Sequence, residues 1–203
     1  VLLIGCFPAS VFLFQYTHKR ITHNHHAHDF TKWMWILFWV VLILFSIVKT
    51  KIVHYSSLCY FPLTFLAALQ LYRLGHEPLK LKRTVKWILL GIGSVIALLI
   101  TALPLIGLNK QKLIPYINDP FAVGNLSAKV PWSYSECAWG ILYLLAIWTA
   151  VLMMRKSFRN GMILLCVTQV IIIQVTVLHF TPKIEGYSQH AAFEYCKSFA
   201  HKD

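Results

Sequence analysis

The sequence predicts an all-α fold, a polytopic bundle of membrane-spanning helices. Hydrophobic residues make up 58% of the 203 residues, charged residues only 13%, and the mean hydropathy is +0.62. A soluble domain carries roughly twice that share of charged residues. The apolar residues are also gathered into long runs separated by polar connections, which is typical of repeated membrane crossings.

Six spans are expected, because a span needs about 20 mostly apolar residues and shorter runs can be extended by aromatic or lysine flanks. The first run opens at Val1 without an initiator Met, so we expect a fragment with a truncated first span. The second, third, fifth and sixth runs contain no acidic or basic residue other than His179, and the fourth contains only Lys86. Prolines inside these runs are tolerated in membrane helices. The expected spans are Val1–Tyr16, Trp33–Val48, Ser56–Tyr72, Val85–Leu108, Cys137–Met154 and Met162–Phe180.

The domain organisation follows from the last span. Residues 1–182 are assigned to a transmembrane helical domain, the C-terminal part of a larger membrane domain. Residues 183–203 are assigned to the start of an extracytoplasmic segment or domain.

Loop charges orient the spans, because lysine and arginine favour the cytoplasmic side. The connections at 17–32, 73–86 and 155–161 hold eleven of the nineteen basic residues, every arginine, and only Asp29 and Glu77 as acids. The other connections and the tail hold eight basic and five acidic residues. The first set is therefore predicted to be cytoplasmic. The net charge of +12 is then loop charge at a membrane surface, and it does not indicate nucleic-acid binding, which needs a soluble basic face.

Two lysines stand between the second and third spans, on the side that disfavours them. Lys49 and Lys51 are followed at once by His54 and Tyr55, and neither flanking run holds an acid that could neutralise them. Charge this close to hydrocarbon is usually paired, snorkelling or functional. The functional interpretation is an anion site at the outer membrane face, where lysine supplies charge and Tyr55 and His54 supply directed hydrogen bonds. A phosphate on a lipid carrier lies at that depth.

The other motifs indicate a function less specifically than the two lysines do. The loop His18–Asp29 holds five histidines, which are common metal ligands, but it lacks the fixed scaffold of a metal site, and we expect a solvated polar loop. Gly91 and Gly93 lie inside a span, where they indicate close helix packing rather than a nucleotide motif. Asp119 and Glu136, in the long outer loop, are the acids there that could do acid–base chemistry, and the sequence identifies no partner for either.

The segment FSIVKTKIVHYSSLCYFPLTFLAAL resembles the signature of bacterial members of the dolichyl-phosphate-mannose–protein mannosyltransferase family, which includes the aminoarabinose transferases acting on lipid A. The family's usual form is F-S-x-x-K-x-K-L-P-x-Y-x-L-P. The matching residues are Phe45, Ser46, Lys49, Lys51 and Tyr55, whereas Val53 replaces the usual proline and Ser57–Leu58 departs from the usual continuation. The segments TPKIEGYSQHAAF and INDPFAVGNLSAKVPW are also similar to the family.

The resemblance implies a GT-C glycosyltransferase of the bacterial inner membrane. Such an enzyme moves a sugar from a polyprenyl-phosphate carrier to a lipid or protein acceptor on the outer side. Lys51 and Tyr55, with Lys49 close by, would then belong to the carrier-phosphate site. The family's catalytic acid lies in its first outward loop, which we expect to be missing here, so no catalytic residue is assigned. A divalent cofactor is not assignable.

The alternative is a polytopic transporter or membrane scaffold whose histidine loop binds metal on the cytoplasmic side. A transporter is expected to show internal repeats and polar groups at mid-membrane depth. No repeat is evident, and the mid-span polar groups are few, among them Ser94, Thr101, Gln169 and Gln174. The sequence therefore favours the glycosyltransferase.

Overall fold

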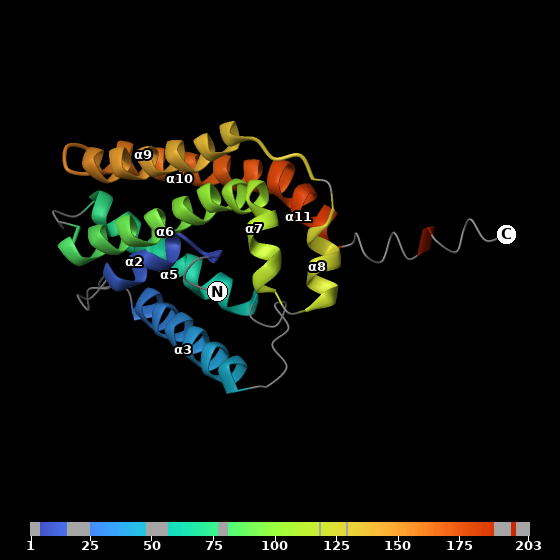
Figure 1. Cartoon of the computed structure of the whole chain (residues 1–203). Coiled ribbons are helices and arrows are strands. Elements are labelled where there is room, and N and C mark those ends of the chain that lie inside the picture. The colour runs from blue at the N-terminus through green and yellow to red at the C-terminus, as the bar shows by residue number, and fades with distance from the viewer. Residues whose placement is uncertain are drawn as a thin grey trace. The chain divides into compact units, whose positions relative to one another are not determined.

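The computed structural model describes residues 5–15, 25–47, 57–76, 81–117, 119–128, 130–188 and 196–197. Within these residues every regular element is a helix, and none is a strand, which confirms the all-α class (Figure 1). In the described part of the chain, four helices are long and apolar enough to cross a membrane: His28–Ile47, Arg83–Leu108, Tyr134–Met153 and Phe158–Ser188. These helices support an integral membrane protein.

The remaining two predicted spans differ from these four. Among the described residues of the first, α2 (Ala9–Phe12) makes a single turn and continues as a short 3₁₀ turn, η1 (Leu13–Gln15), rather than as one long helix. The third corresponds to α5 (Tyr60–His76), which has 17 residues and is therefore about 26 Å long, at the short end of the range for a span. The prediction of six spans is thus not confirmed.

Contacts within the chain gather into two compact units, one formed by Val1–Ile92 with Ala150–Ile163 and one formed by Gly93–Thr149 with Leu164–Asp203. In the first unit, α2 and α3 (His25–Ile47) pack on α5, which follows the 3₁₀ turn η2 (Ser57–Cys59). Phe12 and Leu63 are fully buried, and Phe30 meets Phe65 edge to face at 5.1 Å between ring centroids. Apolar burial of this kind is what holds short helices such as α2 in place.

The same unit buries polar groups on α5. Gln70 and Arg73 are 2% and 4% exposed. Arg73, expected in a cytoplasmic connection, thus lies in the last turn of α5, where a cation favours the negative end of the helix dipole. A polar contact also joins distant parts of this unit. The side-chain oxygen of Gln15, in η1, accepts a hydrogen bond of 2.9 Å from the backbone N–H of Lys82, just before α6 (Arg83–Leu108).

The second unit is organised around close packing of α6 and α9 (Cys137–Met153) at glycines. A Cβ built on Gly140 would lie 2.7 Å from the carbonyl oxygen of Ala97, and one on Gly93 would lie 2.8 Å from the side chain of Ile147. The predicted packing role is therefore confirmed for Gly93, whereas nothing lies within 4 Å of a Cβ on Gly91. Small residues let membrane helices approach closely in this way.

The last long helix is continuous from Phe158 to Ser188, through α10 (Phe158–Val175), a π-helical turn η5 (Thr176–Phe180) and α11 (Thr181–Ser188). The wide turn is explained by Pro182, which has no N–H and whose ring would clash with a carbonyl one α-helical turn earlier. The N–H of Thr181 bonds instead to the carbonyl of Thr176, five residues back. The 31 residues extend about 46 Å, longer than the roughly 30 Å hydrocarbon core. The boundary at 182/183 expected from the sequence lies inside α11.

Between α6 and α9 the chain forms short helices: α7 (Lys110–Leu113), η3 (Ile114–Tyr116), α8 (Pro120–Leu126) and η4 (Tyr134–Glu136). Each has seven residues or fewer, so none can cross a membrane. They lie in the long loop, residues 109–136, that the sequence predicts on the outer side.

Candidate functional site

A buried carboxylate lies where this loop meets α9. Glu136 is 8% exposed and ends η4. Its Oε1 accepts a hydrogen bond from Lys183 Nζ and lies 3.4 Å from His179 Nε2. The turn that presents it begins at Ser133, whose carbonyl accepts from the Glu136 N–H at 3.1 Å and whose Oγ accepts from the Ser135 N–H at 3.3 Å. The serine thus caps the turn in the way that N-cap residues do.

Lys183 is held on several sides. Besides Glu136, its ammonium group donates to the carbonyl of Pro131 at 2.8 Å and lies 5.0 Å from the centre of the Trp132 ring. An ammonium group has three donors, and two of them have acceptors here while the aromatic face attracts the charge. Lys183 therefore serves as an internal partner of the loop.

Aromatic side chains extend the cluster. Trp132 donates its indole N–H to Tyr187 Oη at 2.8 Å and stacks on Phe180 with ring centroids 6.2 Å apart. The indole also lies against Gly107 near the end of α6, where an added Cβ would come within 2.4 Å of the ring. Lys110 Nζ lies 5.3 Å from the Tyr187 ring centre and donates to the Ala128 carbonyl. These contacts join the loop between α6 and α9 to the end of α6 and to α11.

The chemistry available to Glu136 is restricted by its burial. Its Oε2 is enclosed and has no hydrogen-bond partner among the described residues, while Oε1 is taken by Lys183. A general base must be able to reach the proton that it removes, and this carboxylate is covered. His179, with 43% of its side chain exposed, is the most open polar group of the three. The arrangement is suited to fixing the loop and to presenting an imidazole beside it.

The residues predicted to bind the carrier phosphate, Lys49, Lys51 and Tyr55, lie outside the described residues, as does His54. The structure ends α3 at Ile47 and begins η2 at Ser57, on either side of them. Most of the histidine loop also lies outside the described part of the chain. Within that part, no group of three or more histidine, cysteine, aspartate or glutamate side chains is placed to hold a metal ion.

Sequence reasoning missed the partners of Glu136, because Lys183 is 47 residues away and no spacing rule connects them. A weaker signal was present. Glu136 directly precedes the fifth predicted span and Lys183 follows the sixth, so a helical hairpin places both charges at the same end. Tyr143 Oη donates to Gln169 Oε1 at 2.8 Å, as expected for two antiparallel helices. Comparison of the chain with protein-family models, curated proteins and solved structures finds no match.

Proposed function

We propose that this chain belongs to a membrane glycosyltransferase of GT-C architecture in the bacterial inner membrane, which transfers a sugar from a polyprenyl-phosphate carrier to a lipid or protein acceptor on the outer face. The observation that carries the proposal is the motif of Lys49, Lys51 and Tyr55, which begins two residues after α3 ends at Ile47. A cationic pair at the end of an apolar helix lies at the depth of a lipid phosphate.

The chemistry of sugar transfer supports this role for the motif. When the sugar leaves, negative charge grows on the carrier phosphate. Fixed cationic donors stabilise that charge more in the transition state than in the ground state, which lowers the barrier. Lysine serves as a point charge for phosphate, and the hydroxyl of Tyr55 adds a directed hydrogen bond.

Connectivity supports an outer-face site. Among the described residues, the short turn η2 and the two helices α5 and α6 lie between the motif and the loop that carries Glu136. If both helices cross the bilayer, the motif and this loop lie on the same side. The loop is held by the Glu136–Lys183 pair and by Trp132, so it is a fixed element rather than a loose connection. In this proposal the loop lies on the outer side of the membrane, and Glu136 holds it in place without acting as the base.

The test is an assay of the purified full-length protein with a polyprenyl-phosphate sugar donor. Lys51→Ala should reduce transfer by about ten- to a hundredfold, which corresponds to the free-energy contribution of a hydrogen bond to a charged group. Tyr55→Phe should reduce transfer less, because it removes one hydrogen bond and no charge. Lys49→Ala should reduce transfer least of the three, because the resemblance assigns the phosphate site to Lys51 and Tyr55, with Lys49 only close by.

Lys112→Ala is the matched control. It removes an exposed lysine from α7, on the same predicted side, and should leave transfer unchanged. Normal transfer and normal donor affinity in Lys51→Ala would leave snorkelling as the better explanation of the motif and would end the proposal.

A further inference from the structure

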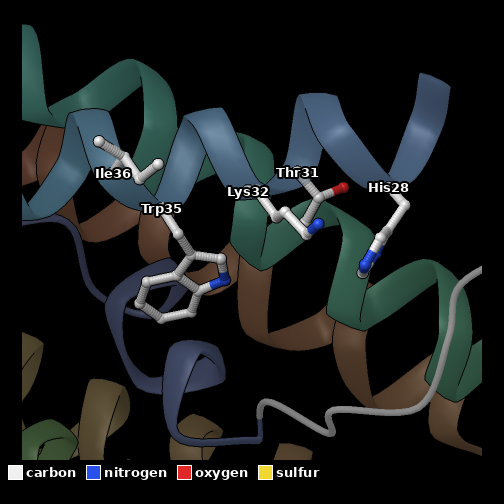
Figure 2. A pocket seen from close by; sticks show the side chains of 5 residues that line it. All are labelled: His28, Thr31, Lys32, Trp35 and Ile36. Atoms are coloured by element: carbon white, nitrogen blue, oxygen red, sulfur yellow. The ribbon is translucent and has the colours of Figure 1, made fainter. Parts of the chain in front are cut away.

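A cavity of about 400 Å³ opens beside the first turns of α3, in the first unit. It is lined by His28, Thr31, Lys32, Trp35 and Ile36. Figure 2 shows the side chains of His28, Lys32 and Trp35 extending from the same side of the helix. The spacing of three to four residues explains why they share a face. A volume of this size is within the range of small-molecule sites.

The lining changes from polar to apolar along the helix. His28, Thr31 and Lys32 form the end where the candidate span begins, and Trp35 and Ile36 continue into it. Seven residues separate His28 from Trp35, which is about 10 Å along the helix axis. A phospholipid has the same order over the same distance, since its charged phosphate is followed by the glycerol and the acyl chains. Tryptophan is also enriched at this boundary.

Charge favours an anion at the polar end. Lys32 is paired with Asp29, but the two atoms are 3.5 Å apart and both side chains are about 60% exposed. Exposed pairs of this kind contribute little, so Lys32 can exchange Asp29 for a phosphate at small cost. His28 supplies a second nitrogen on the same face. The connection before α3 also contains Lys19 and Arg20 and no acid before Asp29.

We infer that this cavity binds an anionic phospholipid of the cytoplasmic leaflet, with its phosphate on Lys32 and His28 and its glycerol and upper acyl region against Trp35 and Ile36. Basic pockets beside membrane helices on the cytoplasmic side bind anionic head groups by the same chemistry. This site shares no residue with the predicted phosphate motif of Lys49, Lys51 and Tyr55. The inference therefore does not depend on whether the protein transfers a sugar.

The experiment titrates the purified full-length protein in detergent with dioleoyl phosphatidylglycerol and counts bound lipid by native mass spectrometry. Phosphatidylcholine of the same chains is the neutral comparison. We expect preference for phosphatidylglycerol, and about tenfold weaker binding in the double variant His28→Gln, Lys32→Gln. Asp29→Asn should bind more tightly, since it frees Lys32. Lys86→Gln, on the same predicted side and not among the residues that line the cavity, is the control.

Two further arms identify the ligand. Trp35→Ala should weaken phosphatidylglycerol binding, and inorganic phosphate should not displace the lipid, because the apolar half of the site contributes to binding. Equal binding of the two phospholipids, unchanged affinity in the double variant, or displacement by inorganic phosphate would each overturn the inference. If the double variant fails to fold, unchanged affinity in Asp29→Asn overturns it as well.

Discussion

Removing the ammonium group of Lys183 tests the buried cluster most directly. Lys183→Met keeps much of the side-chain volume and deletes the charge, so Glu136, with 10% of its side chain exposed, loses the ammonium donor that bonds to its Oε1. Its Oε2 already lacks a partner among the described residues. Removing one member of a buried pair typically costs about 3–5 kcal/mol, because the other charge stays buried.

The expected loss lies at the lower end of that range. His179 Nε2 remains 3.4 Å from the same oxygen and can compensate in part. We therefore expect Lys183→Met to lower the free energy of unfolding by about 3 kcal/mol, more than a hundredfold in the equilibrium constant. Glu136→Gln should cost less, about 1–2 kcal/mol, because the ammonium of Lys183 keeps the Pro131 carbonyl and the Trp132 ring and is not completely enclosed.

The assay is reversible unfolding of the purified protein in mixed micelles of increasing denaturing detergent, followed by tryptophan fluorescence. A double-mutant cycle with Glu136→Leu, Lys183→Met isolates the pair, and this double variant should be more stable than Lys183→Met alone. Lys112→Met, at an exposed position, is the control. A loss below about 0.5 kcal/mol for Lys183→Met, the size of an ordinary surface substitution, or strict additivity of the two changes would refute the reasoning.

Three further predictions concern packing and topology. Gly140→Ala should lower stability by about 1–3 kcal/mol, because its Cβ would meet backbone atoms of α6; Gly91→Ala, in open space, should be neutral or slightly stabilising, and equal effects in the same unfolding assay would contradict this. Tyr143→Phe removes one hydrogen bond between helices and should cost about 0.6 kcal/mol and no more than about 1.7; a larger loss would show that the bond is not isolated. In intact cells, an impermeant thiol reagent should label a cysteine introduced at position 188 and not one at position 157, after native reactive cysteines are removed; the reverse pattern would invert the orientation.

The sequence predicted the long helices well because hydrophobic length is a local property. Cys137–Met154 was expected for the fifth span, and α9 covers Cys137–Met153. The start of α3 at His25 was not foreseen, because the polar residues before Trp33 look like a loop although they continue the helix. The sequence predicts that the sixth span ends at Phe180, where the apolar run ends, whereas the structure continues the helix through the π-helical turn and past Pro182 to Ser188.

The candidate site was less predictable, for a physical reason. A pair such as Glu136 and Lys183 depends on how two distant segments are brought together, and hydropathy contains no information about that. The glycine contact of Gly93 was predicted from type alone, yet its neighbour Gly91 faces open space. A glycine in the sequence therefore indicates that a close helix contact is possible at that position. The packing of the helices decides which of the two glycines makes the contact.

The π-helical turn also determines the direction in which the side chains of α11 project from the helix axis. One extra residue per turn rotates the downstream residues by about 100° relative to an uninterrupted α-helix. Without that rotation, Lys183 and Tyr187 would project about a quarter-turn or more away from Glu136 and Trp132, which they now contact. A single-residue deletion between Thr176 and Phe180 would therefore leave the helix long and apolar but would detach α11 from the loop between α6 and α9.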